Sequence, residues 1–269
     1  TYSRYIKVLR CGNYDVGNGN ITNFSASRGS QYILFEGCYA YGSGRYKFIG
    51  YQSDHLIFRN CVARNDRANP LGEILAGFSM YSCAYTEVQN CIHIDSDQDA
   101  YYVNAGGVSG SFCVPSTDMD SNYVNFNNCI ALKSHIGALC TSKQNYTSNH
   151  VTFTDCSFWD ITNYGDTLLA LLRGDNTTVN HCTFGSMVSP NYYTFNSYNS
   201  SGVNNSTMKN NIIYNCTGQL GLLYDIESFN YNALYSSSLL ASYNTTIGGN
   251  CKTTINPIYN ASTNPTGAL

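Results

Sequence analysis

A short phrase that ends in cysteine recurs along most of the chain, and it constrains the fold more than any other feature of the sequence. In each copy an apolar residue is followed by two further residues and then by Cys. The seven cysteines concerned are Cys11, Cys38, Cys61, Cys91, Cys129, Cys156 and Cys182. An eighth copy carries Asn211 in place of cysteine. The copies follow one another at steps of 23 to 38 residues, a repeat length typical of solenoid proteins.

The residues before each cysteine alternate in the way that a half-buried strand requires. The position three residues before it is apolar in all eight copies, with Val8, Phe35, Phe58, Val88, Phe126, Phe153, Val179 and Met208. The position five residues before it is mostly apolar or β-branched, with Ile6, Ile33, Leu56, Thr86, Val124, Val151, Thr177 and Ser206. The residues between are mostly polar, although Leu34 and Ile57 break the pattern. This alternation predicts a strand with one buried face.

The residue directly before the cysteine indicates a sharp bend. It is Asn60, Asn90, Asn128, Asn210, Gly37 or Asp155 in six of the copies. Asn, Gly and Asp tolerate the left-handed backbone region, and a second short apolar run begins after the cysteine. Each repeat is therefore expected to contain a strand, a corner, a second strand, a loop and a third strand. This predicts an all-β chain, a right-handed parallel β-helix solenoid of about 8–10 rungs.

The repeated phrase resembles that of the pectate-lyase-like superfamily of parallel β-helix proteins. The resemblance covers about residues 6–216 and rests on the repeated phrase of an apolar residue, a variable residue, Asn and Cys. The superfamily contains lyases, hydrolases, phage tailspikes, adhesins and structural surface proteins. The resemblance therefore implies the fold and leaves the function open.

The chain is expected to form a single domain over residues 1–269. Regular rungs would cover about residues 6–216, and irregular last rungs and an exit segment would cover residues 217–269. The sequence begins at Thr1 without Met, so we expect a processed chain or a piece of a longer one. No amphipathic helix precedes the first rung to cover its unpaired edge. Either further chain or a second subunit would cover it, and we expect end-to-end self-association.

The cysteine column has three possible states. Residues in register on adjacent rungs lie about 4.8 Å apart, which is within the Cα span of a disulfide. We favour buried free thiols that act as small hydrophobes, over alternating rung-to-rung disulfides or a metal-binding column. Five further cysteines lie off the column, namely Cys83, Cys113, Cys140, Cys216 and Cys251, and could pair in an oxidising compartment. No C-x-x-C motif occurs.

The composition limits the classes of molecule that the chain is expected to bind. Charged residues make up 12% of the chain, the net charge is −3, and the polar residues are mostly Asn, Ser, Thr and 24 Tyr. This balance argues against nucleic acid, and the absence of a long apolar run argues against membrane insertion. An uncharged surface suits neutral polysaccharides or other copies of the chain. We therefore expect an extracellular or cell-surface protein.

Ten N-x-S/T sequons would permit glycosylation of a surface protein. They lie at Asn20, Asn23, Asn145, Asn176, Asn199, Asn204, Asn205, Asn215, Asn244 and Asn260. An Asn-rich and Ser/Thr-rich composition produces many such sequons by chance, so glycosylation stays one of two interpretations.

The scarce charged residues cluster after the second strand of several repeats. Asp95, Asp97 and Asp99 alternate in a way that suits Ca²⁺, so calcium is a possible cofactor although none is required. If the chain is an enzyme, the proton-abstracting candidates are Lys133, Arg67 and His135. With Arg64 and Asp160, these residues could equally form a network of surface ion pairs.

One histidine and several aromatic residues are further residues that could contact a ligand. His93 lies between two isoleucines and is expected to face outward rather than bind a ligand. Trp159 could stack on a sugar ring, as could Tyr101, Tyr102, Tyr192 and Tyr193, or these residues could lie in an interface.

Together these features favour a non-catalytic extracellular β-helix that serves as a structural subunit or adhesive of a cell-surface assembly or filament. The alternative is a carbohydrate-active β-helix, either a polysaccharide lyase or a tailspike-like glycan-binding or depolymerising protein. We lean against enzymatic activity, because the catalytic phrases of the hydrolase branch are missing from the sequence.

Overall fold

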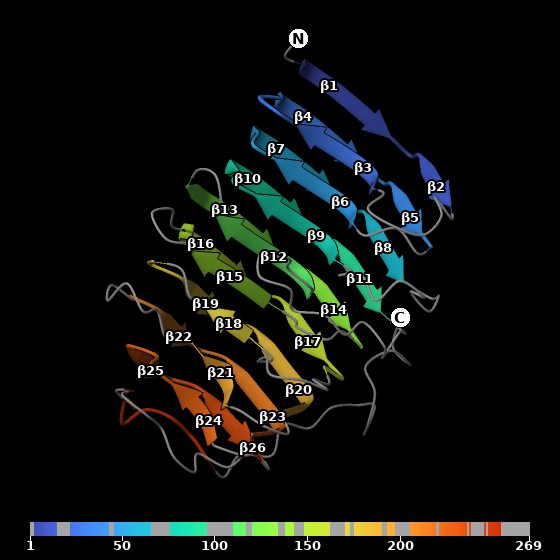
Figure 1. Cartoon of the computed structure of the whole chain (residues 1–269). Coiled ribbons are helices and arrows are strands. Elements are labelled where there is room, and N and C mark those ends of the chain that lie inside the picture. Colours follow the sequence, from blue (N-terminus) through green and yellow to red (C-terminus); the bar gives the residue numbers. More distant parts are fainter. Residues whose placement is uncertain are drawn as a thin grey trace.

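The computed structural model of the chain is a parallel β-solenoid (Figure 1). It describes residues 3–14, 22–42, 46–65, 76–95, 110–116, 120–133, 138–142, 148–161, 170–172, 175–189, 193–196, 205–218, 221–235, 237, 245 and 247–253. Within these ranges the regular secondary structure is all strand, so the predicted all-β class is confirmed. No helix in the described part of the chain could cross a membrane.

The described strands form two nine-stranded sheets and one eight-stranded sheet, and each full coil contributes one strand to each sheet. The first sheet contains β1 (Arg4–Leu9), β4 (Gln31–Glu36), β7 (Asp54–Arg59), β10 (Ala84–Gln89), β13 (Ser121–Asn127), β16 (Ser148–Thr154), β19 (Thr178–Asn180), β22 (Thr207–Lys209) and β25 (Ser228–Asn230). The second contains β2 (Gly12–Tyr14), β5 (Tyr39–Tyr41), β8 (Val62–Asn65), β11 (Ile92–Asp95), β14 (Ile130–Leu132), β17 (Ser157–Trp159), β20 (Thr183–Ser189), β23 (Ile212–Gly218) and β26 (Ala233–Tyr235). The third contains β3 (Thr22–Ser27), β6 (Tyr46–Tyr51), β9 (Ala76–Tyr81), β12 (Gly110–Ser116), β15 (Ala138–Ser142), β18 (Ala170–Leu172), β21 (Tyr193–Asn196) and β24 (Gly221–Tyr224).

The register of the first sheet follows the repeated phrase. Phe58 pairs with Phe35 on one side and with Val88 on the other, so equivalent positions of successive phrases lie side by side. The pairing continues from Met208 to Phe229, beyond the last copy of the phrase. Strands β24, β25 and β26 therefore extend the sheets into the segment after residue 216.

Aromatic side chains form much of the core. Phe35 and Phe58 stack at 5.0 Å between ring centroids, and Phe126 and Phe153 stack at 4.8 Å. These rings are buried because the alternation of the strand turns them away from solvent. Burying a side chain of this size stabilises the fold by roughly 1.5–3 kcal/mol.

The corner before each cysteine has the left-handed backbone that its residue types indicate. The φ angles of Asn60, Asn90 and Asn128 are 55°, 53° and 50°. Their side chains also form a hydrogen-bonded ladder, in which Asn90 Nδ2 donates to Asn60 Oδ1 at 3.1 Å and Asn128 Nδ2 donates to Asn90 Oδ1 at 2.9 Å. Asn therefore both tolerates the bend and links adjacent coils.

The cysteine column lies at the start of the second sheet, and its described members are free thiols. Cys38, Cys61, Cys91, Cys129, Cys156 and Cys182 are buried, whereas Cys11 is exposed on the first coil. Each buried thiol donates to a carbonyl of the preceding coil, as Cys129 Sγ does to Val88 O at 3.3 Å. Burial raises the pKa of Cys91. The column therefore combines small apolar volume with weak hydrogen bonds.

Off the column, Cys83, Cys216 and Cys251 are also free, and burial raises the pKa of Cys83 to about 12. The side chains of Cys113 and Cys140 lie outside the described residues.

Asparagine replaces cysteine in the last two coils of the column. Asn211 Nδ2 donates to Val179 O at 3.1 Å, and its Oδ1 accepts from the backbone N–H of Cys182 at 2.8 Å. Asn232 Oδ1 in turn accepts from the backbone N–H and the side chain of Asn211. The buried amide thus bonds to both neighbouring coils, which a thiol does more weakly.

The prediction that His93 faces outward is wrong. His93 is 1% exposed and lies in the inward column of the second sheet, in register with Ala63 and Ala131. Gly77 makes room for the ring, because a Cβ at this position would lie 2.5 Å from His93 Cδ2. Burial, together with the positive charge of the buried Lys47, lowers the pKa of His93 to about 3.

Candidate ligand-binding groove

A row of stacked aromatic rings runs along the outer face of the first sheet. It occupies the position six residues before the column cysteine in six successive coils. We call it the aromatic ladder, and its members are Tyr5, Tyr32, His55, Tyr85, Tyr123 and His150. Successive ring centroids lie 5.0, 4.6, 5.1, 5.3 and 4.7 Å apart. The spacing of the rings therefore follows the spacing of the strands.

The ladder residues adopt a left-handed backbone. The φ angles of Tyr32, Tyr85 and Tyr123 are 56°, 50° and 57°. This conformation costs an ordinary L-residue roughly 1–2 kcal/mol, and bulky side chains adopt it rarely. In the next coil the same column carries Asn176 with φ 53°, a residue type that suits the bend. Tyrosine is therefore an unfavourable residue type for this left-handed conformation.

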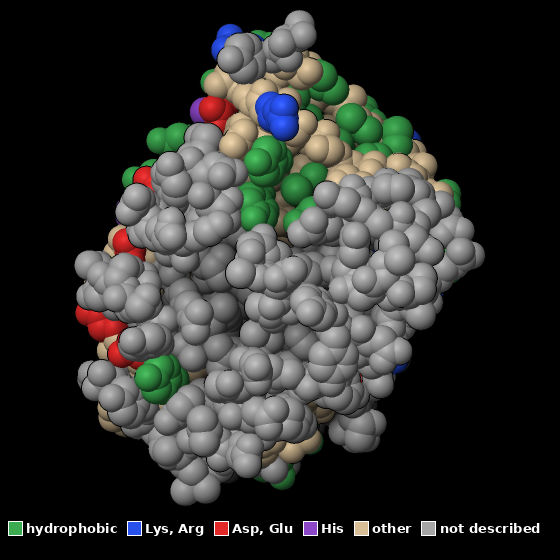
Figure 2. Space-filling model, in the orientation of Figure 1, with side chains coloured by type: hydrophobic (Ala, Val, Ile, Leu, Met, Phe, Trp, Pro, Cys, Tyr) green, Lys and Arg blue, Asp and Glu red, His purple; other side chains and the backbone are tan. Residues whose placement is uncertain are grey.

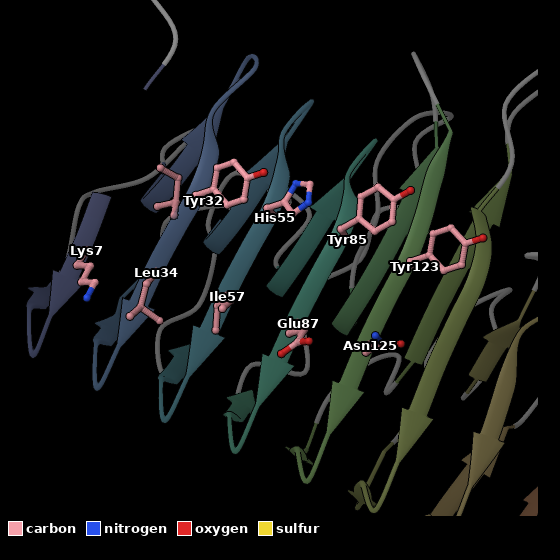
Figure 3. Close-up of a pocket in the computed structure, with 10 residues that line it drawn as sticks. Lys7, Tyr32, Leu34, His55, Ile57, Tyr85, Glu87, Tyr123 and Asn125 are labelled. Carbon is pink, nitrogen blue, oxygen red and sulfur yellow. The ribbon is translucent and has the colours of Figure 1, made fainter. Parts of the chain in front are cut away.

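The ladder forms one wall of a groove. The groove has a volume of about 460 Å³, which is in the range of small-ligand sites. Its lining comes from five adjacent strands, β1, β4, β7, β10 and β13 (Figure 3). The lining residues are Lys7, Tyr32, Ile33, Leu34, His55, Ile57, Tyr85, Glu87, Tyr123 and Asn125.

The second row of the groove lies further along the same strands. Figure 3 shows Lys7, Leu34, Ile57, Glu87 and Asn125 following one another across the five strands. Leu34 and Ile57 provide an apolar stretch, with Lys7 on the coil before it and Glu87 and Asn125 on the coils after it. These are the two apolar residues that break the alternation in the sequence, and the groove gives them a role.

The charged groups beside the groove are held in local pairs. Asp54 Oδ1 lies 2.9 Å from His55 Nδ1, and Asp54 Oδ2 accepts from Gln31 Nε2 at 2.9 Å. Glu87 Oε2 accepts from Gln89 Nε2 at 2.6 Å. The lining itself holds one cationic side chain, Lys7, and one carboxylate, Glu87. The groove therefore has no strong field of either sign.

The stacking decides which parts of the rings a ligand can reach. Tyr85 has His55 on one face and Tyr123 on the other, at 5.1 and 5.3 Å. The ring edges and hydroxyls are left for solvent, and Tyr32, Tyr85 and Tyr123 are 44%, 55% and 45% exposed. Their hydroxyls point the same way in Figure 3. The wall thus offers a regular row of hydrogen-bonding groups on an apolar support.

Three of the charged residues singled out in the sequence are described with their side chains, and Arg64, Lys133 and Asp160 lie in or directly after strands of the second sheet and do not line this groove. Lys133 and Arg64 are exposed, and the N–H of Lys133 donates to Trp159 O at 3.0 Å. Asp160 is exposed one residue after β17. Arg67, His135, Asp97 and Asp99 lie outside the described residues, as does the side chain of Asp95, whose backbone ends β11. No group of three or more His, Cys, Asp or Glu among the described residues could hold a metal ion.

Trp159 is not available to a sugar. It is 3% exposed and packs on Gly185, where a Cβ would lie 2.0 Å from its ring. It also stacks on Tyr214 at 6.0 Å. Tyr101, Tyr102 and Tyr192 lie outside the described residues, as does the side chain of Tyr193.

The sequons fall into three groups. Asn23 is buried, and its Nδ2 donates to Asn13 O. Asn176 is half-buried, whereas Asn205 and Asn215 are exposed. The other sequons lie outside the described residues, at Asn20, Asn145, Asn199, Asn204, Asn244 and Asn260. The structure therefore leaves Asn205 and Asn215 as the accessible described sites.

Sequence analysis missed the aromatic ladder, although the signal was present. The signal lies in the column six residues before the cysteine, next to the apolar columns three and five residues before it. Six successive copies carry Tyr or His there, and the next two carry Asn176 and Asn205. The same alignment therefore contained both the core and the exposed wall.

The structure is thus a parallel β-solenoid with an exposed row of aromatic rings beside a groove on its first sheet. Comparison of the chain with models of protein families, with curated proteins and with solved structures gives no match. The function therefore has to be inferred from the geometry of the groove itself.

The first coil exposes a second apolar surface. Tyr5, Ile6 and Leu9 on β1 are 76%, 41% and 50% exposed, and Tyr14 on β2 is 65% exposed. Figure 2 shows hydrophobic side chains on the surface at this end of the solenoid. Among the described strands, β1 and β2 pair on one side only.

Proposed function

We propose that this chain is a non-catalytic extracellular adhesive, which binds an extended partner at a cell surface through the groove on the first sheet. The observation that carries the proposal is the aromatic ladder, because it places strained and exposed tyrosines in register along that groove. Strained residues concentrate at functional sites. A structural relationship to adhesins of the pectate-lyase-like superfamily is part of this proposal.

The shape of the groove favours a long partner over a compact one. Its lining is drawn from five adjacent coils, and the same positions recur in each coil. A repeating surface binds a repeating ligand best, because each coil adds an equivalent contact. An adhesive that holds a polymer through many weak contacts fits this arrangement.

Binding without turnover fits the chemistry of the lining. Glycoside hydrolysis commonly uses a pair of carboxyl groups on either side of the scissile bond. Glu87 is the one carboxylate among the ten residues that line the groove. The remaining lining supplies hydroxyls, an amide, an imidazole, the ammonium group of Lys7 and apolar contacts, which are groups that hold a ligand in place.

The exposed first coil favours a second candidate function, a structural subunit that assembles end to end. Unpaired strand edges recruit other strands, and Ile6 and Leu9 would be buried in such a junction. Light scattering tests this proposal. Leu9→Lys should lower the mass of any polymer while the solenoid stays folded, and a monodisperse monomer for the unchanged protein at high concentration would remove the assembly function.

Adhesion is tested by sedimentation of the full chain with a panel of insoluble surfaces: neutral polysaccharides, polyuronates and immobilised protein. We expect retention on at least one surface, and loss of retention when Tyr85→Asn and Tyr123→Asn are combined. Tyr231→Asn is the matched control, since Tyr231 is 57% exposed, has φ 56° and does not line the groove. Equal retention of the double variant and the unchanged protein would refute a role for the groove.

A further inference from the structure

The aromatic ladder has the repeat of a particular class of polymer. We infer that the groove binds an uncharged, β-linked polysaccharide in an extended conformation, laid parallel to the solenoid axis with about one sugar unit for each coil. This inference rests on the proposed adhesive function and names the ligand of that same groove.

The spacing of the ladder supports a glycan over a peptide. Its rings repeat at 4.6–5.3 Å along the axis. One pyranose unit of an extended 1,4-linked β-chain advances by nearly the same distance. An extended peptide repeats its side chains on one face at about 6.6 Å, so it would fall out of step with the ladder within a few coils. A peptide that binds by strand addition would also need unpaired strand edges, whereas β4, β7, β10 and β13 are paired on both sides.

The two walls of the groove match the two kinds of surface on such a sugar. An equatorially substituted pyranose has apolar C–H faces and a rim of hydroxyls. Leu34 and Ile57 offer an apolar strip for the C–H face. The hydroxyls of Tyr32, Tyr85 and Tyr123 point the same way in Figure 3 and can donate to or accept from the sugar rim.

The charges of the lining favour an uncharged chain. Lys7 lies on the first of the five coils and Glu87 on the fourth, so the lining carries one charge of each sign. Asp54 adds a further carboxylate next to His55. A polyuronate would place a carboxylate on every coil and would meet Glu87 and Asp54 without a matching row of cations.

The fold also does not require aromatic residues at the positions of the ladder. Asn176 shows that the same left-handed position is satisfied by an asparagine, whose Nδ2 donates to Asn149 Oδ1 at 2.9 Å. The aromatic residues stop after His150, where the column changes to asparagine. The aromatic ladder is therefore a feature that the fold does not need, and it is confined to one continuous stretch beside a groove. A binding site for a finite length of polymer requires such a stretch.

The test is calorimetric titration of the full chain with soluble oligosaccharides of defined linkage. The probes are β-1,4-linked hexasaccharides of glucose, xylose and N-acetylglucosamine, an α-1,4-linked glucose hexasaccharide, and an oligogalacturonate of equal length. We expect at least one uncharged β-linked probe to bind more tightly than the α-linked probe and the oligogalacturonate. The affinity should rise with chain length up to about five units, because five strands line the groove.

The variants identify the binding site. Tyr85→Asn combined with Tyr123→Asn should weaken the affinity for the bound probe by about tenfold or more, the equivalent of losing two hydrogen bonds from the hydroxyls. Tyr231→Asn should leave the affinity unchanged. Circular dichroism of each variant establishes that the solenoid is folded, so that a loss of binding is not a loss of structure.

Three results would overturn the inference: no uncharged β-linked probe binds, the oligogalacturonate binds best, or binding survives the double variant. The adhesive function is judged separately. If the double variant still loses retention on polyuronate or protein surfaces while the uncharged probes fail, the groove remains the adhesive site and only the class of ligand is wrong. If retention never depends on the ladder, both proposals fail.

Discussion

The first five coils and the last four coils have the same strand pairing but differ in the side chains that they carry. In the inward column of the second sheet the first five coils carry Asn13, Ala40, Ala63, His93 and Ala131, and the last four carry Phe158, Phe184, Ile213 and Leu234. The first part thus has small or polar residues there, together with the buried Lys47. The last part is filled with large apolar side chains.

The outer face changes along the same axis. The aromatic ladder ends at His150, and Asn176 and Asn205 follow it in the column. Asn205 Nδ2 donates to Asn176 Oδ1 at 3.0 Å, so hydrogen bonds replace ring stacking between these coils. The comparison teaches that coil stacking does not require the aromatic ladder. The first coils carry features that the fold alone does not explain, and the following predictions test that division.

The largest expected effect is an acid sensitivity of the first part, due to His93. Its pKa is about 3 in the folded protein and about 6.5 in an unfolded chain, so between these values the unfolded state binds the extra proton. The free energy of unfolding should therefore fall as pH drops from about 6.5 to 3, by roughly 1.4 kcal/mol for each pH unit.

Urea unfolding at a series of pH values measures this effect, and His93→Gln should flatten the profile in that window. Hydrogen exchange should show that β8 and β11 lose protection before β17 and β20. An acid profile that is the same for His93→Gln and the unchanged protein would contradict the assignment.

The next effect concerns the two glycines under buried rings, Gly77 in the first part and Gly185 in the last. A Cβ at Gly185 would lie 2.0 Å from the ring of Trp159. Gly185→Ala should lower the free energy of unfolding by about 1–3 kcal/mol, the usual range for overpacking. The same change in a Trp159→Leu background should cost much less, because the two residues are in contact. If the two changes alter the free energy of unfolding additively in this double-mutant cycle, Trp159 does not pack on Gly185.

An effect of similar size is expected in the cysteine column. Cys129→Ser should lower the free energy of unfolding by about 1–3 kcal/mol, because it buries a hydroxyl in a site shaped for sulfur. In native thiol labelling followed by peptide mapping, Cys11 should react quickly and Cys61 and Cys129 should not, since Cys11 alone in the column is exposed. Rapid labelling of Cys129 without denaturant would contradict the register of the coils.

The smallest effect is expected on the aromatic ladder. Tyr123→Asn loses stacking on Tyr85 and His150, worth about 0.5–1.5 kcal/mol for each pair, and relieves a left-handed strain of about 1–2 kcal/mol. The two terms largely offset each other, so the free energy of unfolding from thermal or urea unfolding should fall by no more than about 2 kcal/mol. A loss of several kcal/mol would make the ladder a structural element and would remove the contrast between the two parts.

Much of the fold was predictable because a solenoid repeats its constraints. The apolar columns at Phe58 and Phe153 and the left-handed corner at Asn90 are set by strand alternation and backbone geometry, which recur at a fixed distance from each cysteine. The rungs beyond residue 216 were predicted only as irregular, because the phrase decays there, whereas the strand register persists to Phe229.

The candidate site was harder to predict because its residues have meaning only when coils are stacked. Tyr85 alone is an ordinary surface tyrosine, and it becomes part of a wall when His55 and Tyr123 lie within about 5 Å on either side. His93 was misassigned for a related reason, since alternation does not say which of two faces is inward when both neighbours are isoleucines. The space over Gly77 accommodates the ring of His93 and turns it inward, and this space exists only when the coils are stacked.

The central claim, that the aromatic ladder is a binding wall in register with a polymer, is tested most directly by a crystal structure of the protein with an uncharged β-1,4-linked hexasaccharide. The account predicts a sugar chain parallel to the solenoid axis between the ladder and the row that contains Leu34 and Ile57, with successive units on successive coils. An empty groove in crystals that hold the oligosaccharide elsewhere, or a chain that runs across the axis, would contradict it.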